Sequence, residues 1–255
     1  MTDVINDNLV FVTGESTTGK SASLMNLKNQ EQWMYLNCEA GKKLPFRWKG
    51  RQHTITNPFQ VYEAFNAVEQ NADGVIAVPG VEGIIVDSAT FLMDMFESVH
   101  VLPAADTMKA WGQYAQFFKN LMQQYVARST KDVVFTAHTL DTYNEKKLCT
   151  ETKVPIKGSL KNVGLESFFS LVISTKRMEL TELKGQESAL LNITPQEEAL
   201  GFKHVFQTQL TKETVHERIR GPMGMWDQKE TFIDNDIQLV FNRLHEYYGT
   251  EAQAA

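Results

Sequence analysis

The sequence predicts an α/β fold with a mostly parallel central sheet, flanked by helices, and a C-terminal antiparallel extension. Short runs of β-branched and aromatic residues alternate with segments of helical periodicity between residues 8 and 138, which is the pattern of parallel βαβ units. A glycine-containing loop follows the first of these runs. Near the C-terminus, strand-like runs follow one another with short turns, which favours antiparallel pairing.

Each element of the predicted core is supported by a local pattern. Apolar runs indicate buried strands, whereas good helix formers or apolar residues spaced three and four apart indicate helices. Asn57 followed by Pro58 is a helix-start signal. In chain order we expect a strand over 8–12, a helix over 22–30, a strand over 33–39, a helix over 58–70, a strand over 83–87, a helix over 89–96, an amphipathic helix over 105–128 and a strand over 132–138.

The remainder of the chain is less regular. Residues 139–164 form a long polar connection, and residues 183–201 are expected to be a hairpin insertion or a flap. The extension is predicted as strands over 167–180, 203–212 and 214–221, followed by a closing amphipathic helix over 234–248 and a frayed tail over 249–255. We expect one domain over residues 1–255, with its core at about 8–178 and the extension and closing helix at 179–248.

Composition narrows the classes of partner. The net charge of −6 means that any contact with nucleic acid would depend on a local group of lysines. Cys38 and Cys149, the two cysteines, lie far apart, which argues against a disulfide framework and a structural zinc site. The sequence contains neither a secretory leader nor a long apolar stretch, so we expect a cytoplasmic protein without membrane contact.

The loop "GESTTGKS" matches the phosphate-binding pattern G-x-x-x-x-G-K-[ST] and lies between a predicted strand and a predicted helix. Glycines let the main-chain N–H groups wrap phosphate oxygens, and the helix N-terminus adds its dipole. Lys20 would reach the β- and γ-phosphates, and the Ser21 hydroxyl would ligate Mg²⁺. The alternative is a flexible surface turn. The residues predicted to bind nucleotide are Gly14, Glu15, Ser16, Thr17, Thr18, Gly19, Lys20, Ser21 and Ala22.

Asp87 ends the apolar run that begins at Gly83, and a buried strand that delivers a carboxylate at its end is typical of a Walker B strand. Asp87 would hold Mg²⁺ through a water, together with Ser21, and its position about 70 residues after the glycine loop favours this role. The alternative is an Asp that caps the helix after an ordinary buried strand.

Two further strand tips carry polar side chains. Glu39 follows the strand that begins at Trp33, where it would polarise the attacking water, unless it is a solvated loop glutamate beside Lys42 and Lys43. His138 ends the next predicted strand and would sense the γ-phosphate, with a plain hydrogen bond at a strand end as the alternative. Because parallel strands end at one edge of a sheet, these tips are expected to converge.

Together these strand tips resemble the RecA-like ATPase core. "IIVDSATFL" is similar to the RecA-type Walker B segment, and Glu39 lies where that family places its catalytic glutamate. His138 stands where RecA-type recombinases carry a glutamine. Within the superfamily, the segments "GSLKNVGLESFFSLVISTKRM" and "RIRGPMGMW" resemble the phage single-strand annealing proteins of the Sak-four type. The resemblance implies ATP and Mg²⁺ as cofactors and self-assembly as a ring or filament.

The resemblance also implies roles for two basic groups. The loop after the fourth core strand faces DNA in this fold, which suggests phosphate contacts for Lys146, Lys147, Lys153, Lys157 and Lys161, unless the loop is a solvated lid. RecA-like oligomers place paired basic residues so that they reach a neighbour's ATP, a role that would fall to Arg218 and Arg220. The alternative is that these arginines pair with acids such as Glu217.

The sequence therefore predicts an Mg²⁺-dependent ATPase that acts on single-stranded DNA in phage-type recombination or annealing, inside a bacterial host and with a single-strand binding protein as a further partner. A second hypothesis is an NTP-driven assembly or packaging factor that acts on a protein. A third is a small-molecule kinase, which the scarcity of arginine between Val61 and Asp132 disfavours.

Overall fold

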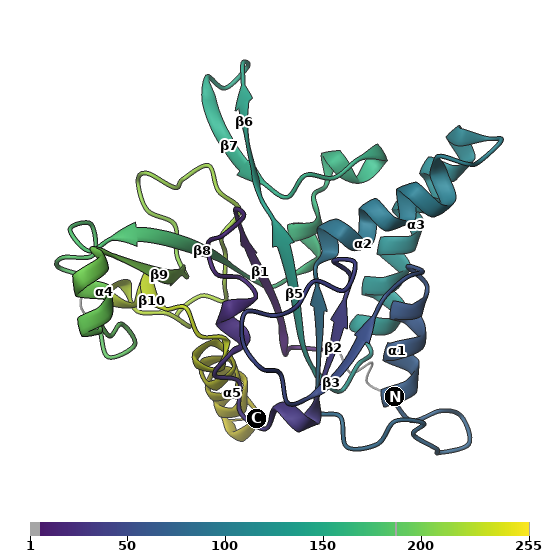
Figure 1. Ribbon diagram of the computed structural model, residues 1–255, viewed down its shortest axis with the longest axis horizontal. Coiled ribbons are helices and arrows are strands. Elements are labelled where there is room, and N and C mark those ends of the chain that lie inside the picture. The colour runs from purple at the N-terminus through teal and green to yellow at the C-terminus, as the bar shows by residue number, and fades with distance from the viewer. Residues whose placement is uncertain (1–5, 187, 255) are drawn as a thin grey trace.

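The computed structural model describes residues 6–186 and 188–254, with side chains as far as residue 249. Within these residues one sheet has eight strands in the order β10-β9-β8-β1-β5-β4-β2-β3, and β6 and β7 form a separate pair (Figure 1). The strands are β1 (Leu9–Gly14), β2 (Trp33–Asn37), β3 (Arg51–Thr54), β4 (Gly83–Asp87), β5 (Asp132–His138), β6 (Leu140–Asn144), β7 (Cys149–Lys153), β8 (Leu171–Glu179), β9 (Phe202–Gln207) and β10 (Phe232–Asp234).

The sheet is parallel from β3 to β8 and becomes antiparallel at β9 and β10. The predicted α/β fold with a C-terminal antiparallel extension is thus confirmed. β5 lies between β1 and β4, so the tip of β5 separates the strand that ends at Gly14 from the strand that ends at Asp87. All the parallel strands end at the same edge, which is where ligands bind in open α/β sheets.

Alternate residues of the central strands serve two cores, because successive side chains point to opposite faces of a sheet. Phe11 packs with the helices α1 (Gln60–Val68), α2 (Ala89–Phe96) and α3 (Thr107–Asn120). Val10 and Val12 pack on the other face with α5 (Ile237–Ala254). The helix predicted over 89–96 is confirmed with its predicted ends, and those over 58–70, 105–128 and 234–248 are confirmed with shifted ends. α5 continues through the tail that was expected to be frayed.

The helix predicted after the glycine loop is wrong. Residues Ala22–Leu24 form a 3-10 turn, and a second one follows at Gln30–Gln32. The connection from β1 to β2 covers residues 15–32, and within it Asn29 has a φ of +50°, a left-handed conformation that a right-handed α-helix does not contain. The predicted helix-dipole contribution to phosphate binding therefore has no helix to supply it.

The C-terminal half differs from the prediction at several points. The connection 139–164 is not irregular, because β6 and β7 pair as an antiparallel hairpin that projects from the sheet (Figure 1). The strand predicted over 214–221 is absent from the described residues, where isolated bridges at Glu217 and Arg220 take its place, and β10 is the third strand of the extension. The insertion 183–201 contains the short helix α4 (Pro195–Leu200), which begins with a capping box of Thr194 and Glu197. In the described part of the chain, no helix has the length and apolar character to cross a membrane.

Candidate functional site

A cavity of about 690 Å³ opens where the parallel strands end. The loop after β1 supplies Lys20 and Ser21, the tip of β4 supplies Asp87, and the residues after β2 and at the end of β5 supply Glu39 and His138. The structure thus brings together the residues that the sequence predicted as phosphate-binding, metal-holding and water-activating. A volume of this size is typical of a small-molecule site.

The glycine loop is tightly packed on its outer side. A Cβ at Gly14 would lie 2.1 Å from the Thr175 hydroxyl oxygen, and a Cβ at Gly19 would lie 2.6 Å from the Asn235 amide nitrogen. Gly19 also has a φ of +104°, a region that other residues rarely adopt. Both glycines are therefore required by close approach, which is what the phosphate-binding pattern predicts.

Lys20 is buried, and its ammonium group donates to the main-chain carbonyls of Gly14 at 2.9 Å and Glu15 at 2.6 Å. Burial lowers the pKa of Lys20 to about 8, against the opposing effect of the Asp87 and Glu39 carboxylates. The ammonium is thus desolvated and held inside the loop, where a phosphate would offer it stronger acceptors than the two carbonyls.

The predicted nucleotide-binding residues divide between two neighbouring cavities. Gly14, Glu15 and Thr18 line a smaller cavity of about 240 Å³ beside the middle of β8. Ser16 and Thr17 line both cavities. Of the predicted nucleotide-binding residues, those that line the main cavity are Ser16, Thr17, Gly19, Lys20, Ser21 and Ala22.

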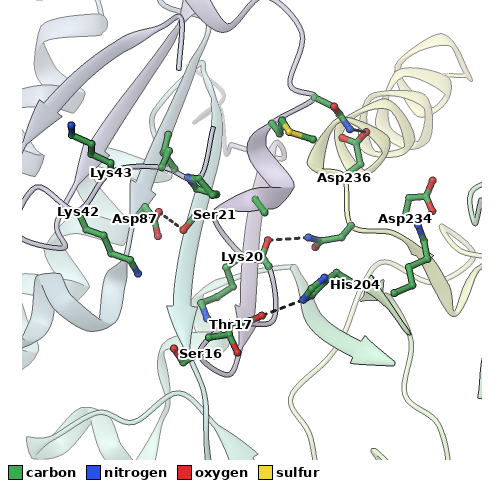
Figure 2. A pocket seen from close by; sticks show the side chains of 18 of the residues that line it. Ser16, Thr17, Lys20, Ser21, Lys42, Lys43, Asp87, His204, Asp234 and Asp236 are labelled. Atoms are coloured by element: carbon green, nitrogen blue, oxygen red, sulfur yellow. Dashed lines mark hydrogen bonds and ion pairs between the residues drawn. The ribbon is translucent and has the colours of Figure 1, made fainter. Parts of the chain in front are cut away.

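Asp87 accepts hydrogen bonds from three hydroxyl groups. Ser21 Oγ donates to Asp87 Oδ2 at 2.9 Å (Figure 2). Tyr35 Oη donates to the same oxygen at 2.8 Å, and Thr136 Oγ1 donates to Asp87 Oδ1. Burial, followed by the nearby Asp87 charge, raises the pKa of Tyr35, so Tyr35 stays a donor. The adjoining oxygens of Ser21 and Asp87 are the ligand type that Mg²⁺ prefers, and they fit the predicted metal site.

Glu39 is paired with two basic side chains. Its carboxylate lies 3.3 Å from His138 Nε2 and 3.0 Å from Lys42 Nζ, and its side chain is only 8% exposed. The hydrogen bond with His138, with a smaller contribution from Lys42, lowers the pKa of Glu39 to about 2. Glu39 is thus a carboxylate at neutral pH and not the solvated loop residue of the alternative hypothesis.

The main chain at His138 is tied to the helix after the Asp87 strand, because the His138 N–H donates to Thr90 Oγ1 at 2.9 Å. His138 therefore contacts Glu39 through its ring and α2 through its backbone. A histidine in this position is suited to the predicted sensing of the γ-phosphate. Its hydrogen bonds also agree with the alternative, in which His138 only makes a hydrogen bond at a strand end.

Several residues of the site were not found from the sequence. Tyr35 and Asn37 alternate with core residues of β2 and carried no motif signal. His204 and Asn235 come from the extension. His204 Nε2 lies 3.2 Å from the Thr17 carbonyl oxygen (Figure 2), and Asn235 Nδ2 donates to the Gly19 carbonyl at 2.9 Å. No local pattern links them to the glycine loop. Other lining residues from this part of the chain are Thr194, Glu197, Lys203, Asp234 and Asp236.

Most of the predicted DNA-binding lysines have acidic partners within the chain. Lys147 and Lys153 both pair with Glu151, and Lys157 pairs with Glu97. Lys146 and Lys161 are exposed. Lys153, Lys157 and Lys161 line a cavity of about 350 Å³ at the base of the β6–β7 hairpin, away from Lys146 and Lys147 at its turn.

Arg218 and Arg220 both donate to the segment 163–169, and they do not line the main cavity where the predicted role would place a phosphate of their own chain. Arg220 donates to the carbonyls of Glu166 and Phe169. Arg218 donates to the Val163 carbonyl at 3.3 Å and lies 3.5 Å from the Glu166 carboxylate. The predicted alternative partner, Glu217, instead pairs with Lys176.

Comparison with known proteins assigns the chain to a protein family. A family model described as "AAA domain" matches residues 6–209, which include the glycine loop, Glu39, Asp87 and His138. A search of curated proteins found no match. Among solved structures, the chain is similar to the flagellar accessory protein FlaH from Methanocaldococcus jannaschii, with 10% sequence identity over 80% of this chain and 78% of that chain and a TM-score of 0.31. A likeness of that degree says nothing about function.

Proposed function

Because the chain belongs to the AAA domain family and has the fold of a RecA-like P-loop ATPase, we propose that it binds and hydrolyses ATP with Mg²⁺ and acts on single-stranded DNA. The observation that carries the nucleotide part is the meeting of Lys20, Ser21 and Asp87 in one cavity with Glu39. The DNA part, in phage-type recombination or annealing of the Sak-four type, rests on the sequence resemblance and on the position of the hairpin.

Each residue of the cavity has a distinct role in the proposal. Lys20 leaves the carbonyls of Gly14 and Glu15 to bind the β- and γ-phosphates. Ser21 and Asp87 would hold Mg²⁺, which would neutralise charge on the phosphates. Glu39 accepts a hydrogen bond from the attacking water and orients it toward the γ-phosphorus. His138, in contact with Glu39, responds to the presence of the γ-phosphate.

The hairpin is the proposed DNA-binding element. β6 begins at Leu140, close behind His138 at the end of β5, so a change at His138 has a short path to the hairpin. Its lysines would contact phosphates, and the exposed ring of Tyr143 offers a surface on which a base can stack. The proposal includes assembly into a ring or filament, a single-strand binding protein as a further partner and a cytoplasmic location. It also treats core and extension as one domain, since β8 pairs with both β1 and β9.

A protein partner is the second candidate. Three acids, Asp141, Glu145 and Glu151, accompany Lys146, Lys147 and Lys153 in the hairpin, so its charge is balanced. Leu140, Tyr143 and Leu148 are exposed there as well. Balanced charge with exposed apolar side chains favours contact with a protein, as expected for an assembly or packaging factor.

The rate of ATP hydrolysis, measured with and without single-stranded DNA, tests the proposal. We expect turnover that requires Mg²⁺ and rises when DNA is added. Replacing Lys146, Lys147, Lys153, Lys157 and Lys161 with Gln should weaken DNA binding and flatten its salt dependence, because each phosphate contact contributes ~0.7 to the salt slope on single strands. A variant with the same substitution at five other exposed lysines, Lys28, Lys109, Lys184, Lys212 and Lys229, controls for the loss of net charge.

The outcomes separate the candidates. If the rate of ATP hydrolysis is the same with and without DNA, and the variant with five substitutions binds DNA as the wild type does, the results favour a function that acts on a protein partner. A protein that neither binds nor hydrolyses ATP would contradict the proposal as a whole.

A further inference from the structure

The turn after β2 is held in place by one buried side chain. Asn37 is fully buried, and its Oδ1 accepts from the Glu39 N–H at 2.9 Å while its Nδ2 donates to the Lys42 carbonyl at 2.8 Å. Ala40 and Gly41, with φ values of +51° and +78°, reverse the chain between them. A left-handed conformation at a residue other than glycine is uncommon and persists only where its surroundings impose it. The two hydrogen bonds of Asn37 link the residues on either side of this reversal.

The reversal brings Lys42 back over Glu39. The Lys42 N–H donates to the Glu39 carbonyl at 3.0 Å, and the Lys42 ammonium lies 3.0 Å from Glu39 Oε2. The side chain of Lys42 extends toward the phosphate-binding loop, whereas that of Lys43 extends in the opposite direction (Figure 2). Lys42 is 69% exposed, so it is free to move toward a ligand, and its charge is among the causes that lower the pKa of Lys20.

We propose that Lys42 is a catalytic residue that binds the γ-phosphate of its own chain's ATP and neutralises charge during hydrolysis. This role rests on the ATPase function proposed above. In this reaction the water oxygen bonds to the γ-phosphorus and a water proton passes to Glu39. The bond from the γ-phosphorus to the bridging oxygen breaks, and ADP leaves with that oxygen and the electron pair. Lys42 moves from Glu39 to the phosphate oxygens, which offer its ammonium a higher negative charge.

The arrangement of the chain favours this role for Lys42. Arg218 and Arg220 bind the segment 163–169 of their own chain, and none of the described residues that line the main cavity within this chain is an arginine. Lys42 already lies beside the residue that would orient the water, on a turn fixed by Asn37. Its departure from Glu39 also removes one cause of the low pKa of that carboxylate, which makes Glu39 a better proton acceptor when ATP is bound.

Binding of two nucleotides that differ by the γ-phosphate tests the role. We would measure the affinities of ADP and of the β,γ-imido analogue of ATP, both with Mg²⁺, for the wild-type chain and for Lys42→Ala, Lys42→Arg and Lys43→Ala. Lys42→Ala should weaken binding of the analogue by ~10-fold or more, the loss expected for a hydrogen bond to a charged group, and leave ADP binding unchanged. Its ATP turnover should fall by ~10²-fold or more. Lys42→Arg should restore most of both, and Lys43→Ala should match the wild type.

Each other result overturns the role. If Lys42→Ala weakens ADP and the analogue equally, Lys42 does not bind the γ-phosphate. If turnover falls while both affinities stay unchanged, Lys42 acts only through its ion pair with Glu39. Wild-type binding and turnover in Lys42→Ala would overturn the role of Lys42 alone, whereas a wild-type chain that binds neither nucleotide would overturn the ATPase proposal together with it.

Discussion

The amide nitrogen of Asn235 donates to the Gly19 carbonyl at 2.9 Å, across 216 residues of chain, and the C-terminal extension thereby holds the phosphate-binding loop from outside. His204 makes a second contact of this kind with Thr17. Asn26, just beyond the loop, donates to Asp236 at 3.1 Å. These contacts support the loop at the position where the expected helix is missing.

Asn235→Ala should weaken ATP binding and lower the free energy of unfolding. The substitution leaves the Gly19 carbonyl without its side-chain donor, a loss of ~1 kcal/mol for one hydrogen bond, and it loosens the loop that must wrap the phosphates. Denaturant unfolding and nucleotide titration measure the two effects. Asn242→Ala, on the exposed side of α5, is the matched control and should change neither. Equal ATP affinity in the two variants would show that the extension does not support the loop.

Lys20→Ala should abolish ATP binding without loss of fold. Burial lowers the pKa of Lys20 to about 8, so the folded protein bears a cost for keeping this ammonium charged at neutral pH. Removal of the charge relieves that cost, and the variant should melt at the wild-type temperature or above it. Lys28→Ala, at an exposed position, provides the control. Undiminished ATP affinity in a folded Lys20→Ala protein would refute the phosphate-binding role.

ATP binding should take up a proton in alkaline solution. In the free protein Lys20 loses its proton as the pH rises through about 8, whereas bound phosphates favour the ammonium and raise its pKa. Below pH 8 both states carry the proton and no uptake occurs. Above pH 8 binding must restore it, so the affinity should fall by up to ~10-fold per pH unit. Calorimetry in buffers of different ionisation enthalpy measures the uptake, and a constant affinity between pH 7 and pH 9.5 would contradict it.

The parallel core and the proximity of Lys20, Glu39, Asp87 and His138 could be predicted because both depend on short patterns in the sequence. A strand is visible in a short apolar run, and parallel strands end at one edge whatever the details of their connections. Glu39, Asp87 and His138 stand at the ends of such runs, and Lys20 lies in the glycine loop that follows the first of them. The sheet topology alone therefore predicts that these residues lie close together, and no individual contact has to be known.

Contacts that depend on distant segments could not be predicted. The segment 22–30 has favourable helix propensity, but Gln238 accepts from the Lys28 N–H, and Asn29 adopts a left-handed conformation. Tertiary contacts of this kind override a weak local preference in a short helix. The β6–β7 hairpin was missed for another reason: its strands are polar and exposed, so the apolar alternation that marks a strand is absent.

Glu39→Gln should retain ATP binding and lose most turnover. Glutamine keeps the size and hydrogen bonding of glutamate but cannot accept a proton, and a general base contributes ~10²–10⁴-fold to a rate. The ion pairs of Glu39 also stabilise the fold, because its pKa is lowered from 4.5 to about 2. That stability is complete above pH 4.5 and is lost as the pH falls toward 2, so acid unfolding of the variant should depend less on pH in this range. A near-wild-type rate would move the base elsewhere, with His138 next.

Arg218 and Arg220 are expected to contribute differently to the stability of the fold. Arg220 donates to two main-chain carbonyls, so Arg220→Ala should destabilise the fold through these lost hydrogen bonds. Arg218 has a side chain that is 36% exposed and a longer pairing with Glu166 at 3.5 Å, so it can leave that partner for a phosphate of a neighbouring subunit. Thermal melting of the two single variants distinguishes them, and equal melting temperatures would contradict the distinction.

If Arg218 reaches a neighbour's ATP, one chain cannot complete its own site. Turnover per chain should then rise with protein concentration, and Arg218→Ala should bind ATP but hydrolyse it slowly, because a cation at the transferring phosphoryl group is missing. Mixing Arg218→Ala with Lys20→Ala should restore part of the activity, since the second variant lends an intact arginine to the first variant's intact loop. Arg218→Ala mixed with itself at the same total concentration is the control. A mixture that stays inactive, with turnover independent of concentration, would leave Arg218 with only its contacts to Val163 and Glu166.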